Sequence, residues 1–591
     1  MCGIVGYFGE SNAVKVVMNG LVNLEYRGYD SAGIAYIEHN KLIINKEKGR
    51  VGSLFEIVEK AESNLAIGHT RWATHGEPSR VNAHPHLSYS GRFAIVHNGI
   101  IENYLKLKLE HLSDIDLVSE TDTEVIVNLI DHFAKELSVS EAIRKTMTLL
   151  EGSYACLVID KNNLTNIYFF KDKSPLLLGI GKTGVSFSSD VTGLIGCAEE
   201  YSVLEDKTFG IASKKDFYLY DIIGLKKSKN FQKFDYKTDQ IDKKAYEHFM
   251  LKEIYEQPFI IRNLINNYFD GEDVKISPIL INKIRKCDKI NFVASGSSMY
   301  ASYLAKYYME KLCGIPCEVF CASELVYSTP LISKKPFFIF FSQSGETADS
   351  IAVIKKVKKQ KHPTLTITNC PESTLVRLSN YYLDLYAGKE IAVASTKAYT
   401  AMIVVSAILA RAVGGNKTNL KNNLKSVSLA MEKVLESKEL CKGIAMDIIN
   451  SNDLFYIGRG IDYWTALEAS LKLKEIAYIH TEAFSSGELK HGPIALINNG
   501  TPVIAIITQE GTNMITRSNL LETIARGAKP FVIASKSLSM PNDNIIIPNV
   551  AHYLSPLVSV LVVQLIAYYA AILKNNDVDK PKNLAKSVTV E

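Results

Sequence analysis

The chain begins with Met1-Cys2-Gly3-Ile4-Val5-Gly6, and the first domain has to be built around this stretch. If Met1 is removed, Cys2 carries a thiol and a free α-amine on one residue. An α-amine titrates near pH ~8, so a substantial part of it is unprotonated at neutral pH and can act as a general base toward the thiol. Gly3 leaves space around the sulfur. A cysteine at position two can also be incidental, so this interpretation depends on the rest of the chain.

Composition limits the class of protein. A length of 591 residues predicts two to four domains. A hydrophobic content of 47% and a charged content of 22% are typical of a soluble globular protein. The net charge of +4 is small and provides no basic face for nucleic acid. Nine cysteines in so long a chain are no disulfide framework, so we expect a reducing, cytoplasmic location.

One segment reaches the length of a membrane span. Ser555–Leu573 contains no charged side chain. However, it contains Gln564 and two tyrosines, and it opens with Ser555-Pro556, which is typical of a helix start. We therefore interpret it as a buried helix and expect no membrane partner. The first residues show no secretory signal, because Gly, Glu, Asn and Lys interrupt their apolar positions.

Residues 2–220 combine short strands and helices, which predicts an α+β domain. Residues 221–244 are rich in Lys, Asp, Asn and Gln and are predicted to be a linker, followed by a helix-prone segment from Ala245. In the first domain we expect strands at Cys2–Phe8, Gly33–Ile37, Leu65–Thr70 and Phe93–His97, and helices at Ala13–Tyr26 and Asp122–Leu137.

The remainder has the pattern of a degenerate duplication. The apolar runs Lys289–Ser295 and Leu454–Gly458 each meet a glycine, Gly296 or Gly460, and then a helix. A Glu-Leu pair follows at the same distance from both glycines. Strands that alternate with helices predict two doubly wound parallel sheets. We place these domains at residues 245–430 and 431–578, before a polar tail at residues 579–591.

Two stretches of the first domain carry candidate chemistry. Gly68–Gly76 concentrates cationic, hydroxyl and aromatic groups, and Arg71 can bind the α-carboxylate of an amino acid. Asp122 can bind the α-ammonium group, although an N-cap for the following helix is the alternative. Asn98-Gly99 follows a strand, where a hairpin turn is common. The alternative is an oxyanion hole made by the Asn98 amide and the Gly99 N–H.

The first domain contains five separated motifs, which are, in sequence order, Cys2–Gly6, Arg27–Gly33, Gly68–Pro78, His97–Gly99 and Asp122. Together they resemble the glutamine amidotransferase domain with an amino-terminal cysteine nucleophile, an Ntn hydrolase. The resemblance implies a four-layer αββα core with Cys2 as nucleophile and base. It also implies that Asn98 and Gly99 form the oxyanion hole and that Trp72 shields the site and gates ammonia release. Glutamine would then lie among Arg71, Thr74, His75 and Asp122.

In the duplicated part, Phe341-Ser342-Gln343-Ser344-Gly345-Glu346-Thr347 follows a strand and opens a helix. Backbone N–H groups at a helix start bind anions, and three hydroxyl side chains add donors. The lysine of a nucleotide P-loop is missing, which favours a sugar phosphate over a nucleotide. A Ser-rich N-cap is the alternative for any one of these residues. Ser297-Ser298, after the neighbouring strand, could complete the cradle.

Four further residues suit proton transfer or imine chemistry. Lys472 and Glu475 lie three residues apart on one helix face, where a surface ion pair is the alternative. His491 lies in a loop flanked by Gly and Pro and suits proton transfer near neutral pH, although a lone histidine is more often structural. Lys586 lies near the carboxyl end, where a lysine is normally solvated. In a desolvated pocket it can form a Schiff base with a keto sugar.

The duplicated part resembles tandem sugar isomerase (SIS) domains of flavodoxin-like strand order. With the first domain and the tail, the resemblance covers Cys2 to Glu591. The chain resembles a family of homodimeric, cofactor-free enzymes. These enzymes convert fructose 6-phosphate and glutamine to glucosamine 6-phosphate and glutamate, the first step of hexosamine synthesis. This implies that ammonia travels from Cys2 to the sugar, that Glu475 moves a proton between C1 and C2, that His491 opens the ring and that Lys586 forms the Schiff base. The implied phosphate ligands are Ser298, Ser342, Gln343, Ser344 and Thr347, and the implied sugar contacts are Ser297, Val393, Ser395 and Ala585, with Lys472 and Arg459 nearby.

One departure and three alternatives accompany this resemblance. The first sugar loop reads Ala294-Ser295-Gly296-Ser297-Ser298, where the family more often has Cys-Gly-Thr-Ser. Cys313, Cys317 and Cys321 are evenly spaced, but Gly314 and Pro316 interrupt a helix there and no histidine lies nearby, so we expect no metal site. A non-catalytic sugar-phosphate sensor and an amidotransferase or deaminase acting on a different keto-sugar phosphate remain open.

Overall fold

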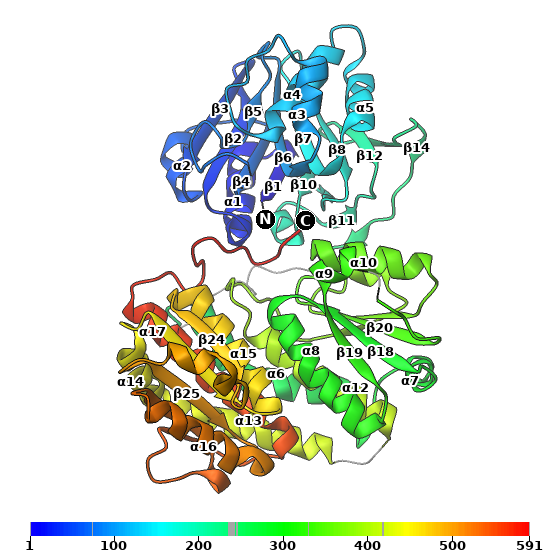
Figure 1. The fold of residues 1–591 in the computed structure, drawn as a ribbon. Helices are drawn as coiled ribbons and strands as arrows, with labels where there is room; N and C mark the ends of the chain where they lie inside the picture. The colour runs from blue at the N-terminus through cyan, green and yellow to red at the C-terminus, as the bar shows by residue number, and fades with distance from the viewer. Residues whose placement is uncertain are drawn as a thin grey trace. The chain divides into compact units, whose positions relative to one another are not determined.

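The computed structural model describes residues 2–73, 75–234, 243, 246–328, 330–415 and 419–589, apart from the side chain of Tyr26. It divides into two compact units, of which one takes in residues 1–242 with 585–591 and the other residues 243–584 (Figure 1). Each unit is described by itself below.

The first unit is built on two antiparallel sheets. The eight-stranded sheet has the order β15-β11-β9-β10-β1-β4-β2-β3, and the seven-stranded sheet has the order β14-β13-β12-β8-β7-β6-β5. The strands of the first sheet are β1 Gly3–Gly9, β2 Ser31–Glu38, β3 Lys41–Lys48, β4 Leu65–Arg71, β9 Leu177–Gly181, β10 Gly184–Ser188, β11 Glu200–Val203 and β15 Gln232–Lys233. Those of the second are β5 His86–Leu87, β6 Phe93–Ile101, β7 Gly152–Asp160, β8 Asn163–Asp172, β12 Thr208–Ala212, β13 Phe217–Asp221 and β14 Lys226–Lys227.

The side chains of β1 explain the layered arrangement. Successive residues of a strand point to opposite faces, and both faces of β1 are buried. Ile4 and Phe8 enter the core between the two sheets, whereas Val5 and Tyr7 pack in the core shared with α1 and α2. A third core joins the outer face of the second sheet to α3, α4 and α5 (Figure 1). The expected αββα architecture is therefore confirmed. The helices are α1 Ala13–Leu24, α2 Gly52–Val58, α3 Tyr104–His111, α4 Asp122–Phe133 and α5 Val139–Leu149.

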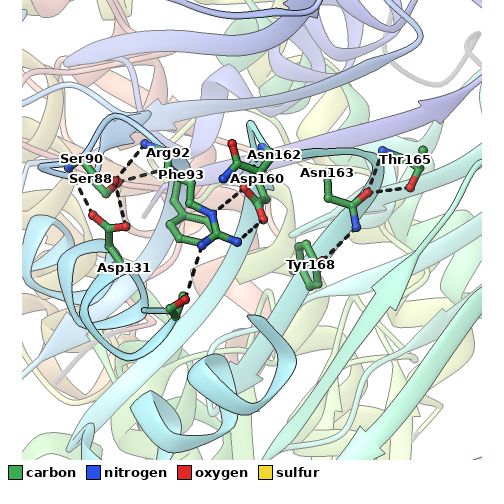
Figure 2. A network of polar contacts seen from close by, with 11 residues as sticks. Ser88, Ser90, Arg92, Phe93, Asp131, Asp160, Asn162, Asn163, Thr165 and Tyr168 are labelled. Carbon is green, nitrogen blue, oxygen red and sulfur yellow. Dashed lines mark hydrogen bonds and ion pairs between the residues drawn. The ribbon is translucent and has the colours of Figure 1, made fainter. Parts of the chain in front are cut away.

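A polar network fixes the elements that later carry the first site. The Arg92 guanidinium donates to both carboxylate oxygens of Asp160, from Nε at 3.0 Å and from Nη2 at 2.9 Å, and so ties the start of β6 to the end of β7. The Ser90 hydroxyl donates to Asp131 of α4 at 2.8 Å. Figure 2 shows these contacts side by side. Since Asp160 is only 1% exposed, this bidentate pair holds β6 in place more firmly than a surface ion pair could.

The second unit contains two five-stranded parallel sheets. Their orders are β19-β18-β20-β21-β22 and β24-β23-β25-β26-β27, which are both 2-1-3-4-5 when strands are counted along each half. This is the expected flavodoxin-like order. The strands are β18 Lys289–Ala294, β19 Cys317–Cys321, β20 Pro336–Ser342, β21 Thr364–Thr368 and β22 Tyr381–Asp384 in the first sheet, and β23 Asp453–Gly458, β24 His480–Ser485, β25 Pro502–Ile507, β26 Lys529–Ser535 and β27 Ile545–Ile547 in the second.

The two halves correspond element by element. Gly296 and Gly460 follow the first strand of each half, and both have a positive φ, 56° and 59°. The helices after them, α8 Gly296–Tyr308 and α15 Ile461–Lys472, both continue into a π-helical turn, Met309–Cys313 and Leu473–Ala477. The helices α10 Ala348–Lys359 and α16 Asn513–Ile524 have equal length and follow the N-cap residues Thr347 and Thr512. The expected duplication is confirmed.

Helices between and around these sheets form the largest core. Two helices in the described ranges are long and apolar enough to cross a membrane, Lys397–Gly414 and His552–Leu573, but 89% and 83% of them is buried. Both belong to the apolar core of the second unit, as expected for Ser555–Leu573. The remaining helices of this unit are α6 Phe249–Tyr268, α7 Pro278–Arg285, α9 Ala322–Tyr327, α11 Thr374–Leu378, α12 Lys397–Gly414, α13 Leu420–Glu436, α14 Lys438–Ile448 and α17 Ser555–Leu573.

Candidate active sites

Cys2 immediately precedes β1 and lies beside the loop that follows β4. Its Sγ accepts a hydrogen bond from the Trp72 N–H at 3.2 Å, and its carbonyl oxygen accepts one from Asn98 Nδ2 at 3.0 Å. Burial raises the pKa of the Cys2 thiol. A thiol with a raised pKa stays protonated at neutral pH, so it needs a nearby base before it can attack a carbonyl carbon.

Asn98 and Gly99 lie inside β6 and pair with Ala155 and Tyr154 of β7. The interpretation of Asn98-Gly99 as a hairpin turn is therefore wrong. Gly99 has a φ of 136°, and a Cβ built on it would lie 1.9 Å from the Ser153 carbonyl oxygen. Only glycine fits this backbone, which places the Asn98 amide beside Cys2.

A small pocket adjoins the Cys2 thiol, and four of the predicted glutamine-binding residues line it together with Cys2 and Gly99: Arg71, Trp72, His75 and Asp122. The fifth, Thr74, lies outside the described residues. Arg71 is 3% exposed, and its guanidinium donates to the backbone carbonyls of His75, Gly76 and Glu77, so it shapes the loop that closes the pocket. The Asp122 carboxylate accepts the Ile101 N–H at 2.8 Å. The N-cap of α4 is Thr121 rather than Asp122.

The sequence interpretation missed a group of buried histidines at this pocket, two of which, His84 and His97, line it. The group consists of His69, His84, His86 and His97, all 5% exposed or less. The rings of His69 and His84 stack with centroids 4.1 Å apart. Burial lowers the pKa of each of the four, that of His69 to about 3, so they are neutral at physiological pH. The available signal was the density of histidines, five between residues 69 and 97, of which these are four.

In the second unit, the predicted phosphate ligands lie where β18 and β20 end. These neighbouring strands flank the point at which strand order reverses, the usual ligand position in such sheets. The hydroxyls of Ser342 and Thr347 lie 3.0 Å apart, and Ser342 Oγ accepts the Gly345 N–H at 2.9 Å. Ser344 Oγ accepts the Glu346 N–H at 3.2 Å. Gln343 lies in the same loop, and Ser298 lies in the first turn of α8.

A buried charged cluster lies beside this cradle. Lys472 is fully buried and forms ion pairs with Glu475 at 2.5 Å and with Glu468 at 3.4 Å, which excludes a surface pair. Its Nζ also donates to Ser297 Oγ at 3.1 Å, and this hydroxyl donates to Glu468 at 3.1 Å. The structure thus brings Ser297, Lys472 and Glu475 together and adds Glu468, which the sequence interpretation missed. The signal was its position four residues before Lys472 on the same helix.

The electrostatics of the cluster follow from burial. Burial raises the pKa of Glu468 to about 7, although Lys472 opposes this. For Lys472 burial disfavours the charge, but Glu468 and Glu475 outweigh it and raise the pKa. Lys472 is therefore a permanent buried cation, and Glu468 can exchange a proton near neutral pH.

The loop before α12 carries two predicted sugar contacts. The Val393 N–H donates to the Asp579 carbonyl at 3.0 Å, and the Ser395 hydroxyl donates to Glu390 at 3.2 Å. His491 ends the short helix Glu488–His491 and is exposed. The Arg459 guanidinium lies over Gly487 in the preceding loop. Ala585 and Lys586 belong to residues 585–591, which group with the first unit, so their contact with the sugar stays a prediction.

The second half holds a different group at the corresponding place. Asp462 stands two residues after Gly460, as Ser298 stands two residues after Gly296, and Ile507 ends β25 where Ser342 ends β20. Asp462 is 1% exposed, and its carboxylate accepts the N–H of Thr508 at 2.8 Å and the Thr508 hydroxyl. The chain thus supplies its own carboxylate to the N–H and hydroxyl donors of Thr508, whereas the predicted phosphate ligands of the first half are uncharged Ser, Gln and Thr side chains.

Replacing Asp462 with asparagine is expected to stabilise the second unit at neutral and alkaline pH. Burial raises the pKa of Asp462 from ~3.9 in an unfolded chain to about 7 in the folded one. The folded chain binds a proton at Asp462 more tightly than the unfolded chain does. The stability that this proton contributes is fully present below pH ~4 and is lost as pH rises through about 7. An asparagine side chain cannot ionise, and its amide oxygen can still accept the Thr508 N–H. Thermal or urea unfolding should show a gain of up to about 4 kcal/mol at pH 8 that disappears near pH 4. A gain independent of pH would contradict this account.

Within the ranges that the structure describes, no group of three or more His, Cys, Asp or Glu side chains could hold a metal ion.

Comparison with known proteins agrees with both halves of the chain. The family model described as a glutamine amidotransferase domain matches residues 69–196, and the one described as a SIS domain matches residues 283–412 and 447–574. The glutamine–fructose-6-phosphate aminotransferase (isomerizing) of Listeria monocytogenes is 49% identical over the full length of both chains, and that of Staphylococcus aureus is 46% identical over the full length of both. Among solved structures, the C-terminal domain of glucosamine-fructose-6-phosphate aminotransferase from Francisella tularensis is similar with 35% identity and a TM-score of 0.55. The match covers 57% of this chain and all of that domain.

Proposed function

The chain belongs to the glutamine–fructose-6-phosphate aminotransferase (isomerizing) family, and from this premise we propose how its residues convert fructose 6-phosphate and glutamine to glucosamine 6-phosphate and glutamate. The observation that carries the proposal is that one chain holds both Cys2 beside the Asn98 amide and a hydroxyl cradle beside the buried Lys472. The first arrangement suits release of ammonia from an amide. The second suits a phosphorylated keto sugar.

At the first site the α-amine of Cys2 takes the thiol proton, and Sγ attacks the side-chain amide carbon of glutamine. The Asn98 amide and the Gly99 N–H stabilise the negative oxygen of the tetrahedral intermediate. Ammonia leaves with the proton, and a γ-glutamyl thioester remains on Cys2. Water then hydrolyses the thioester to glutamate. Arg71, Thr74, His75 and Asp122 hold the amino acid, and Trp72 covers the pocket.

At the second site Ser298, Ser342, Gln343, Ser344 and Thr347 hold the phosphate, and Ser297, Val393, Ser395 and Ala585 contact the sugar. His491 opens the ring. Lys586 attacks C2 and expels water to give an imine, from which ammonia displaces the lysine. Glu475 removes a proton from C1 as the imine nitrogen gains one, which gives an enaminol. Addition of a proton to C2 with loss of the C1 hydroxyl proton then gives the aldose with an amino group at C2. Lys472 and Arg459 provide positive charge nearby, and ammonia reaches this site without release to bulk solvent.

The test is product formation from the two substrates. The purified chain with glutamine and fructose 6-phosphate should yield glucosamine 6-phosphate and glutamate in equal amounts. Absence of product with all keto-sugar phosphates tested would favour a sensor, and product with only another keto sugar would correct the substrate. We further propose that the enzyme is cytoplasmic and forms a homodimer. Light scattering of the purified enzyme tests the homodimer, and fractionation of the cells that make it tests the location.

A further inference from the structure

His69 lies on β4 of the eight-stranded sheet, is fully buried, and faces Asn98 on β6 of the other sheet. Its Nε2 lies 3.0 Å from the His97 carbonyl oxygen and 3.1 Å from Asn98 Oδ1. This contact crosses the core between the two sheets, directly behind the Cys2 backbone that the Asn98 amide reaches.

The partners decide which ring nitrogen of His69 carries the proton. The Cys2 carbonyl can only accept, so the Asn98 group facing it is the NH₂, and Oδ1 therefore faces His69. Oδ1 and the His97 carbonyl are both acceptors, so Nε2 must carry a proton and donate to both. His69 Nδ1 is buried and has no hydrogen-bond partner in the part of the chain that the structure describes. The neutral tautomer of His69 with its proton on Nε2 satisfies all these contacts.

We propose that His69 is a positioning residue that locks the Asn98 amide with its NH₂ toward Cys2 and polarises it as a donor to the oxyanion. The inference rests on the proposed function, since it concerns the oxyanion hole of that reaction. If the Asn98 amide turned over, its NH₂ would meet the His69 N–H and its oxygen would meet the Cys2 carbonyl, and both contacts would repel. The His69 N–H that donates to Asn98 Oδ1 also draws electron density from the Asn98 nitrogen toward the oxygen. This makes the Asn98 N–H groups stronger hydrogen-bond donors.

The surroundings keep His69 in this state. The His84 ring stacks on it at 4.1 Å with an interplanar angle of 12°, and burial lowers the pKa of His69 to about 3. The ring is therefore an uncharged donor throughout the working pH range. It takes no proton from the substrate, because Asn98 stands between it and Cys2.

The test compares two variants of the full-length enzyme by glutamate release from glutamine. His69→Phe removes the donor, and about a 10- to 100-fold loss of kcat is expected, less than the ~10²–10³-fold loss from deleting an oxyanion donor itself. His69→Gln places an amide N–H near the position of Nε2 and should stay within about fivefold of wild type. The KM for glutamine and the pH profile should not change in either variant, and alkylation of Cys2 by iodoacetamide, which passes through no oxyanion, should keep its rate.

A matched control comes from the same histidine cluster. The His86 ring lies edge-on to the His84 ring, and its Nε2 contacts the Thr121 hydroxyl rather than Asn98. The variant His86→Phe should therefore alter thermal stability while kcat stays near the wild-type value. Wild-type kcat in His69→Phe, or equal losses in His69→Phe and His69→Gln, would overturn the positioning role. Should His69→Phe fail to fold, ¹⁵N NMR of histidine-labelled wild type decides the matter, because a proton on Nδ1 contradicts the assignment. A wild-type enzyme without glutaminase activity would instead refute the proposed function.

Discussion

Replacing Cys2 with alanine is expected to abolish glutamine-dependent glucosamine 6-phosphate synthesis, with a loss of at least about 10³-fold, while isomerisation of the sugar phosphate continues. Cys2 Sγ is the nucleophile in the proposed pathway, and the cradle of Ser342 and Thr347 with the Lys472 cluster lies in a separate compact unit. Glutamate and glucosamine 6-phosphate should be measured in the same reaction with glutamine, and isomerisation of fructose 6-phosphate should be measured in parallel.

A serine at position two is the matched control for this variant. Serine preserves the size of the side chain and removal of Met1, but its hydroxyl is a far weaker nucleophile than a thiol at neutral pH. Both variants should therefore lose glutamate release alike, and intact-mass measurement should show that wild type lacks Met1. Loss of sugar isomerisation in Cys2→Ala would contradict the division of labour between the two sites, and glutaminase activity in a chain that retains Met1 would contradict the assignment of Cys2.

Local pattern predicted the elements that carry the site. β1, β4 and β6 are apolar runs bounded by turn residues, and the repeated strand–glycine–helix pattern around Gly296 and Gly460 predicted the two parallel sheets. Helix ends were less well predicted, since the helix expected to reach Leu137 ends at Phe133. Helix ends depend on capping and tertiary packing, which periodicity does not report.

The missed residues share a physical cause. His69 meets Asn98 across two different sheets, and Glu468 becomes significant only because α8 and α15 pack together and bury its carboxylate. Asp462 resembles an ordinary first-turn acid in the sequence, and the turn it contacts lies 46 residues away. Contacts between distant segments leave no periodic signal, so these roles needed the fold.

Replacing Lys472 with methionine is expected to destabilise the second unit by about 3–5 kcal/mol, because Glu468 and Glu475 would face each other without their cation. The loss should be larger at pH 8 than at pH 5. Burial already raises the pKa of Glu468 to about 7, so below that pH the side chain takes up a proton and the uncompensated charge disappears. Calorimetric unfolding of the full chain at both pH values measures this, with glutamate release as evidence that the first unit remains intact.

The double variant Lys472→Met with Glu468→Gln separates charge from packing. Glu468 is fully buried whereas the Glu475 side chain is 20% exposed, so neutralising Glu468 removes the carboxylate that solvent cannot reach. Most of the lost stability should return, since a buried pair replaced on both sides leaves no unpaired charge. Sugar isomerisation should stay low, because Ser297 and Glu475 would still lack the ammonium group that they contact. If the double variant were no more stable than Lys472→Met at pH 8, the unpaired charge of Glu468 would not be the cause of the lost stability, and the hydrogen bond and ion pair that the ammonium group makes with Ser297 and Glu475 would be.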